Sequence, residues 1–347
     1  MNKERRPIFQ PNELSNDAVV SMRTRIITAI VGIAIVLPCV LFGDWAFAVI
    51  ASIALIVAVI EIVRCAKRKY SKLLYIAAFV LAFLVLIWPI FLKIPDMKNG
   101  YRIFDSYYTL YISATILFVG ICLSALLIII DKGFTIIDAC FIFTTVFLIA
   151  LGFQSAFVLR YYPVHAYHQE LNALGQSVPY FNLYDNLESS MLFLWVAVGA
   201  CLNDAFAYFV GVFFGKHKMN ERISPKKTWE GFFGGIILTS IVLTAWAVLL
   251  NWLSGGSHAI LHGLLELKDF HFIHIFVLSV LIPLISTVGD LVFSSIKRYY
   301  GIKDFSNVLP GHGGILDRMD SMIFAFTTVA IYVCIFTQQS GGGINLP

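Results

Sequence analysis

Long apolar stretches recur along this chain of 347 residues, and they constrain its fold more than any other feature. The stretches are roughly 17 to 25 residues long, which is the length of helix needed to cross about 30 Å of hydrocarbon. Hydrophobic residues make up 59% of the sequence and charged residues only 13%, too few to cover the surface of a soluble domain. The sequence therefore predicts an all-α, polytopic integral membrane protein.

About nine transmembrane helices are predicted from these stretches. They fall near residues 26–43, 45–63, 73–92, 108–130, 134–158, 190–214, 231–253, 271–293 and 319–337. With the N-terminus in the cytoplasm, 20 of the 25 lysines and arginines lie in the cytoplasmic segments 1–25, 64–72, 131–133, 215–230 and 294–318. This distribution follows the positive-inside rule and predicts a cytoplasmic N-terminus.

The same pattern divides the chain into regions. These are an N-terminal segment (1–25), N-terminal transmembrane helices (26–158), a C-terminal transmembrane region (190–337) with cytoplasmic loops 215–230 and 294–318, and a glycine-rich tail (338–347) expected to be mobile. The six cysteines show no paired spacing and are interpreted as packing residues. A net charge of +4 is too modest to indicate nucleic-acid binding, so no such partner is expected.

Several acidic residues are predicted to lie at membrane depth. Asp204, next to Asn203, falls in the middle of one apolar stretch, and Asp290 closes another. An intramembrane carboxylate costs roughly 3 kcal/mol on insertion scales, so it persists where it has a partner or faces a wet cavity. A structural hydrogen bond to a neighbouring helix is the alternative explanation, and we adopt it for Glu61 and Asp138.

The segment that begins at Asp290 combines residue types that bind phosphates. Asp290, Ser294 and Lys297 have the spacing i, i+4 and i+7, which places them on one face of a helix. The segment continues with cations, a glycine-rich break and two carboxylates: Arg298, Lys303, Pro310, Gly311, Gly313, Gly314, Asp317 and Asp320. Carboxylates bind Mg²⁺, lysine and arginine bind phosphate oxygens, and glycine-rich backbone supplies N–H donors. Together they indicate a site for a polyphosphate.

Residues 224–235 form a second polar segment with a similar composition. It contains Ser224, Lys226, Lys227, Thr228 and Glu230, followed by Gly231, Gly234 and Gly235. A positive-inside anchor followed by a helix start would explain the lysines, and close helix packing would explain the glycines. Phosphate binding is the other interpretation.

From Ser294 to Asp320 the sequence resembles the signature of the phosphatidate cytidylyltransferases, also called CDP-diacylglycerol synthases. The match has no gap and includes Ser294, Ile296, Lys297, Arg298, Lys303, Asp304, Ser306, Leu309, Pro310, His312, Gly313, Gly314, Ile315, Asp317, Arg318, Met319 and Asp320. Residues 203–208 and 224–235 resemble two further motifs of this family. The first five apolar stretches resemble the family only in being hydrophobic, so no residue roles are carried over to them.

The resemblance implies a reaction of phospholipid biosynthesis in which CTP and phosphatidic acid give CDP-diacylglycerol and pyrophosphate. It also implies that Mg²⁺ occupies a paired metal site held by Asp290 and Asp317, with the identity of the second ion left open. Catalytic roles are implied for Lys297, Arg298, Lys303, Asp304, His312, Arg318 and Asp320, and substrate-binding roles for Asn203, Asp204, Ser224, Lys226, Lys227, Thr228, Glu230, Ser294, Gly313 and Gly314. Whether Lys226 and Lys227 hold lipid or nucleotide is left open, as is the role of His312.

The expected partners are CTP, phosphatidic acid and the lipid bilayer, with the active site on the cytoplasmic side of a bacterial plasma membrane. The sequence leaves open whether the chain forms a homodimer. Two other functions are compatible with these residues. A CTP-dependent polyprenol or phytol kinase would release CDP instead of pyrophosphate. A cation-coupled secondary transporter could use Asp204 and Asp290, but the predicted outer loops carry few charges to line its path.

Overall fold

The computed structural model of the chain describes residues 16–42, 44–68, 70–91, 106–131, 133–161, 169–171, 177–179, 183–253 and 271–338. Within these residues, nine α-helices occupy the nine predicted positions: α1 (Asn16–Phe42), α2 (Asp44–Cys65), α3 (Lys72–Phe91), α4 (Ser106–Ile130), α5 (Ile136–Tyr161), α6 (Leu183–Phe214), α7 (Trp229–Leu253), α8 (His271–Tyr299) and α9 (Leu316–Gln338). Two short antiparallel hairpins lie between helices: β1 (Gln169–Leu171) with β2 (Ser177–Pro179), and β3 (Lys218–Asn220) with β4 (Ser224–Thr228).

Six of the described helices, α1, α2, α5, α6, α7 and α8, are long and apolar enough to cross a membrane. Helices α3 and α4 contain shorter apolar stretches, at Lys72–Ile87 and Ala114–Ile130. A helix is suited to this environment because it satisfies its backbone hydrogen bonds internally. The predicted class of polytopic membrane protein is therefore confirmed, whereas the number of spans and the side of the N-terminus stay predictions. The tail predicted to be mobile lies outside the described residues from residue 339 onward.

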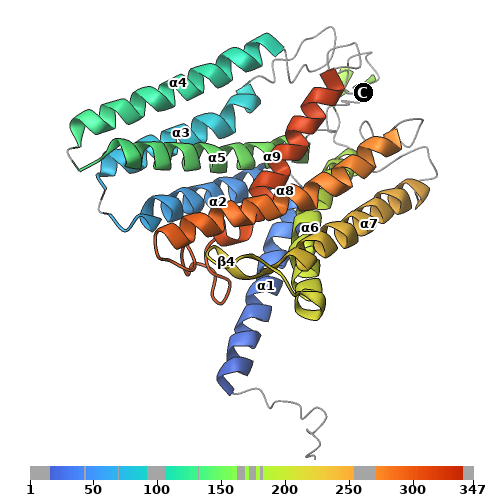
Figure 1. The fold of residues 1–347 in the computed structure, drawn as a ribbon. Coiled ribbons are helices and arrows are strands. Elements are labelled where there is room, and N and C mark those ends of the chain that lie inside the picture. Colours follow the sequence, from blue (N-terminus) through green and yellow to red (C-terminus); the bar gives the residue numbers. More distant parts are fainter. Residues whose placement is uncertain are drawn as a thin grey trace, which may run out of the picture.

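The helices form two groups that meet at α8 and α9 (Figure 1). Helix α5 packs on α3 and α9, α6 packs on α7, and α8 packs on both α7 and α9. One cluster of buried apolar side chains centres on α2, α3 and α5, and a second one centres on α6 to α9. Helix α1 projects from the rest of the bundle, and only 6% of its apolar stretch is buried.

A proline inside α8 leaves a carbonyl without its helical partner, and α7 supplies the replacement. Pro283 has no N–H, so the carbonyl of Ser279, four residues earlier, loses its helical partner. The hydroxyl of Ser240 on α7 donates to that carbonyl at 3.0 Å. Such a replacement is required at membrane depth, where no bulk water can satisfy the freed carbonyl.

The start of α7 lies very close to α6 because glycines leave room for it. A Cβ atom on Gly231 would lie 2.6 Å from the Ala207 carbonyl oxygen, and one on Gly235 would lie 2.9 Å from the Ala207 Cβ. The interpretation of these glycines as packing residues is confirmed. Their contact holds the β3–β4 hairpin, which directly precedes α7, beside the polar part of α6.

Candidate active site

A cavity of about 680 Å³ is lined by residues of α6, the β3–β4 hairpin, the start of α7, α8, the loop between α8 and α9, and the start of α9. Its charged lining consists of five aspartates and five cations: Asp204, Asp290, Asp304, Asp317, Asp320, Lys218, Lys226, Lys227, Lys297 and Arg318. Ser224, Thr228 and Thr287 add hydroxyl groups, and Ala207, Tyr208, Gly211, Val212, Met219, Gly231 and Phe232 complete the lining. A volume within the usual range of about 300 to 1,000 Å³ for ligand sites can accommodate a nucleotide.

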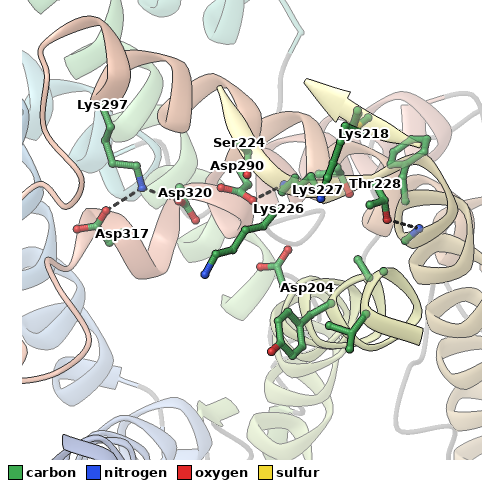
Figure 2. A pocket seen from close by; sticks show the side chains of 18 of the residues that line it. Asp204, Lys218, Ser224, Lys226, Lys227, Thr228, Asp290, Lys297, Asp317 and Asp320 are labelled. Carbon is green, nitrogen blue, oxygen red and sulfur yellow. Dashed lines mark hydrogen bonds and ion pairs between the residues drawn. The ribbon is translucent and has the colours of Figure 1, made fainter. Parts of the chain in front are cut away.

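Asp290 lines the cavity from α8, where it lies near Ser294 and Lys297 as the helical spacing predicted. Its carboxylate accepts a hydrogen bond from Ser294 Oγ at 3.1 Å and forms an ion pair with Lys227 of β4 (Figure 2). The hairpin and α8 are therefore joined at the cavity by opposite charges.

Lys297, also on α8, holds two carboxylates of α9 together. Its Nζ lies 2.9 Å from Asp317 Oδ1 and 3.7 Å from Asp320 Oδ2. The second oxygen of Asp317 accepts the backbone N–H groups of Phe305 at 2.8 Å and Gly314 at 2.9 Å. Asp317 therefore lines the cavity and also fixes the loop that precedes α9.

Asp204 completes the set of carboxylates from the side of α6. The hydroxyl of Ser321 on α9 donates to Asp204 Oδ2 at 3.2 Å, and the Ser321 N–H donates to Asp320 Oδ1 at 2.8 Å. Carboxylates from α6, α8 and α9 thus face one polar space, which accounts for an acidic residue in the middle of an apolar stretch.

Lys226 and Lys227 are neighbours in β4 but have different surroundings. Figure 2 shows Lys226 extending into the space between Asp320 and Asp204, while Lys227 is directed to Asp290. Among the described residues, Lys226 has no carboxylate within ion-pair distance, whereas Lys227 and Lys297 are both paired. Lys226 is therefore available to bind an anion.

The predicted cytoplasmic loop 215–230 is folded into the β3–β4 hairpin, and Glu230 closes it. The Glu230 carboxylate accepts the N–H groups of Lys216 and His217 at 3.1 and 3.2 Å, and it lies 2.6 Å from His217 Nδ1. At the start of α7, Thr228 Oγ1 accepts the Gly231 N–H at 3.1 Å, as a helix N-cap does. Through these contacts, Glu230 and Thr228 both stabilise the local structure of the hairpin and the start of α7.

The structure brings eleven of the predicted site residues to the cavity: Asp204, Ser224, Lys226, Lys227, Thr228, Asp290, Lys297, Asp304, Asp317, Arg318 and Asp320. It does not place the others among the lining residues: Asn203, Glu230, Ser294, Arg298, Lys303, His312, Gly313 and Gly314. Asn203 is buried and donates to Thr287 Oγ1 at 2.9 Å. Arg298 donates to the carbonyls of Ile223 and Ile302 at 3.3 and 3.2 Å. The catalytic and binding roles of all these residues stay predictions.

Lys218 and Thr287 line the cavity but were not predicted from the sequence. Lys218 belongs to the basic segment 215–230, in which no local pattern distinguishes it from Lys216. Thr287 lies one turn before Asp290, on the same side of α8, and this spacing was the one available signal.

The acidic residues have the oxygen ligands that Mg²⁺ prefers. In the structure, Asp290 and Asp317 each hold a lysine ammonium, so each of them already binds a positive charge. Among the described residues, no group of three or more acidic, histidine or cysteine side chains has the arrangement of a metal site. The chemistry of these carboxylates thus fits a divalent cation, and the paired metal site stays a prediction.

The fold and the cavity define a class of protein: a polytopic membrane protein that gathers carboxylates and cations into one cavity suited to a polyphosphate. Within this class, the model of the Cytidylyltransferase family matches residues 23–336. The chain therefore belongs to the Cytidylyltransferase family, which makes it a nucleotidyltransferase.

Relatives of this chain have one name in common. The chain is 27% identical to the phosphatidate cytidylyltransferase of Bacillus subtilis (strain 168) over 319 residues, which cover 92% of this chain and 100% of the relative. It is 26% identical to the phosphatidate cytidylyltransferase of Staphylococcus haemolyticus over 313 residues, covering 89% and 98% of the two chains. These findings confirm the resemblance that the segment from Ser294 to Asp320 indicated.

Proposed function

We propose that this chain is a phosphatidate cytidylyltransferase, which converts CTP and phosphatidic acid into CDP-diacylglycerol and pyrophosphate. The observation that carries the proposal is the composition of the cavity. Five carboxylates and five cations line it, together with apolar side chains of α6 and α7. A nucleoside triphosphate and the headgroup of a lipid together require both charged and apolar groups at one site.

In this reaction a phosphate oxygen of phosphatidic acid attacks the α-phosphorus of CTP. The bond between the α-phosphorus and the oxygen bridging to the β-phosphate breaks, and pyrophosphate leaves. The attacking phosphate is anionic near neutral pH, so no strong general base is required. Repulsion between the two polyanions is the main obstacle, and Lys218, Lys226 and Arg318 line the cavity where they can reduce it.

Mg²⁺ is the cofactor in this proposal, with Asp290 and Asp317 as its ligands. When bound, it supplies positive charge to the phosphates that the carboxylates alone would repel. Binding of the cation by these two aspartates would release Lys227 from Asp290 and Lys297 from Asp317, leaving Lys297 paired with Asp320 alone. Both lysines line the same cavity and could then bind phosphate oxygens.

The lipid is proposed to approach along α6. Tyr208 and Val212 line the cavity and are 63% and 61% exposed. Uncovered apolar side chains on a transmembrane helix face the acyl chains of the bilayer. Because the hairpin beside them is rich in lysine, the positive-inside rule favours the cytoplasmic face of the plasma membrane for this end of the cavity. A soluble nucleotide could then meet a lipid that stays in the bilayer.

The test uses the purified full-length protein in detergent with phosphatidic acid, Mg²⁺ and CTP labelled on either the α- or the γ-phosphate. We expect the α-label to enter the lipid fraction and the γ-label to appear in pyrophosphate. In a parallel reaction with a polyprenol or phytol in place of phosphatidic acid, transfer of the γ-label to the alcohol with release of CDP would identify a kinase instead. Cation uptake by proteoliposomes without nucleotide, together with no labelled lipid, would identify a transporter.

A further inference from the structure

Glu61 lies near the end of α2, outside the lining of the cavity, and only 2% of its surface is exposed. Its hydrogen-bond partners come from the opposite end of the chain. Ser306 Oγ donates to Glu61 Oε1 at 2.5 Å, the Ile315 N–H donates to Oε1 at 3.1 Å, and the Leu316 N–H donates to Oε2 at 2.8 Å. All three donors lie in the signature loop, which we define as residues 300–315, or in the first residue of α9.

The carboxylates of Asp317 and Glu61 together accept four backbone N–H groups of the signature loop and the first residue of α9. Asp317 accepts the N–H groups of Phe305 and Gly314, and Glu61 accepts the next two in the chain, those of Ile315 and Leu316. The first N–H groups of a helix have no partner within the helix and form its positive end, so a carboxylate is well placed there. The conformation of the signature loop therefore depends on a side chain of α2.

Gly314 shows how closely the signature loop fits against Glu61. A Cβ atom at this position would lie 2.6 Å from Glu61 Oε1 and 2.7 Å from Oε2. Such a contact is shorter than the sum of the atomic radii, so either the loop or the carboxylate would have to move. The absence of a side chain at residue 314 thus makes the hydrogen bonds of Glu61 geometrically feasible.

We propose that Glu61 is a positioning residue for cytidylyl transfer. It fixes the signature loop and the first turn of α9, and that turn carries Asp317, Arg318 and Asp320 to the cavity. Glu61 itself does not line the cavity, so its effect on the reaction passes through these residues. The inference rests on the proposed activity, but it does not depend on which residues hold a metal.

Asp138 on α5 provides a matched control. It is also a buried carboxylate, 6% exposed, and accepts hydrogen bonds from Arg68 at 2.7 Å, Tyr70 at 3.1 Å and the Thr135 N–H at 3.1 Å. Burial and the charge of Asp138 raise the pKa of Tyr70, so its phenol stays protonated and can donate. None of these partners lines the cavity, and the charge of Asp138 reaches the signature loop at its first residue, Tyr300, where burial, with a contribution from this charge, raises the pKa of the phenol.

The test compares Glu61→Gln with Asp138→Asn in the full-length protein, after CDP-diacylglycerol formation by the unchanged protein has been measured. The amide that replaces the Glu61 carboxylate has one acceptor oxygen instead of two, so it cannot accept every N–H that the carboxylate accepts. We expect the kcat of Glu61→Gln to fall by about 10- to 100-fold, because small displacements of catalytic groups have effects of this size. The KM for CTP should stay within about twofold of normal. Amide hydrogen exchange within residues 300–315 should accelerate. Asp138→Asn should keep near-normal kcat and normal exchange in this loop.

Near-normal kcat for Glu61→Gln, or unchanged exchange in the signature loop, would overturn the proposal. An equal loss of kcat in Asp138→Asn would also overturn it, because any buried carboxylate would then have the same effect. If Glu61→Gln does not fold, Ser306→Ala removes only one of the three bonds, and we expect it to lower kcat by about threefold. A Ser306→Ala variant with unchanged kcat and exchange would contradict the proposal. Failure of the unchanged protein to form CDP-diacylglycerol would refute the proposed function, whereas loop exchange would still report on Glu61.

Discussion

Carboxylates within or next to apolar helical stretches occur in both halves of the molecule, but they are used differently. In the N-terminal half, Glu61 and Asp138 are surrounded by hydrogen-bond donors and do not line the cavity. In the C-terminal half, Asp204, Asp290 and Asp320 line a polar cavity together with lysines. An acidic residue at membrane depth can therefore have a structural or a functional origin, and whether it lines an open polar cavity distinguishes the two. The type of partner does not decide, because Asp138 is paired with Arg68 and Asp317 accepts two backbone N–H groups.

The largest effect is expected from removing a carboxylate of the C-terminal half. Asp290→Asn and Asp317→Asn should each lower turnover by on the order of 10²- to 10³-fold, because both residues are proposed to stabilise charge in the reaction. Initial rates of CDP-diacylglycerol formation test this prediction. Asp317→Asn should also lower the thermal unfolding midpoint, since this carboxylate accepts two backbone N–H groups, whereas Asp290→Asn should not. Near-normal turnover of either variant in Mg²⁺ would contradict the metal assignment.

A smaller effect is expected from removing a paired cation. Lys297→Ala leaves Asp317 and Asp320 without their shared ammonium group, and an uncompensated buried charge is destabilising. We expect kcat/KM for CTP to fall by about 10- to 100-fold, from loss of roughly 1.4 to 2.8 kcal/mol of transition-state stabilisation. Lys67→Ala is the control, because Lys67 is exposed and does not line the cavity. Equal effects of both variants would mean that these lysines act only as topology signals.

The contact between the two halves can be tested at a glycine. Gly314→Ala introduces a methyl group against the Glu61 carboxylate, and such overpacking typically costs about 1 to 3 kcal/mol. We expect a lower unfolding midpoint and about tenfold lower turnover, because the signature loop must shift. Gly32→Ala in α1 should lower neither quantity, since a Cβ there meets nothing within 4 Å and alanine is the better helix former. If Gly314→Ala behaved like Gly32→Ala, the close fit around Glu61 would be wrong.

The smallest effect distinguishes two neighbouring lysines of the C-terminal half. Lys218 lines the cavity and Lys216 does not, although both lie in the same exposed basic segment. Lys218→Ala should raise the KM for CTP by about fivefold, which corresponds to about 1 kcal/mol for one lost contact. Lys216→Ala should leave the KM within about twofold of normal. Steady-state kinetics at a fixed, saturating lipid concentration would show the difference, and a reversed order would contradict the assignment.

The positions of the helices and much of the cavity could be predicted from local sequence. Hydropathy located all nine described helices because each contains a largely apolar stretch, and six of them are long and apolar enough to cross a membrane. The cost of a charge at membrane depth identified Asp204 and Asp290, and helical spacing placed Ser294 beside Asp290. These inferences require only the residue itself and its neighbours within one or two turns.

Other features depend on contacts between distant parts of the chain and were not predicted. Glu61 was correctly interpreted as a structural hydrogen-bonding residue, but no local pattern indicates that its partners lie 245 to 255 residues away. A substrate-binding role for Glu230 was implied only by the family resemblance and stays a prediction, and no local pattern indicated that its carboxylate accepts the N–H groups of Lys216 and His217 and closes the hairpin. A motif shows which residue types occur together in the sequence. It does not show which backbone N–H groups donate to their side chains, because those groups become neighbours only in the folded protein.

The hydrogen bonds of Glu61 also limit how far the protein can be shortened. A fragment that begins at α6 would keep every residue that lines the cavity, because all of them lie between residues 204 and 320. It would nevertheless leave Ile315 and Leu316 without their acceptor and remove α5, on which α9 packs. The C-terminal helices are therefore not a transferable module, and a minimal version of this protein must retain α2.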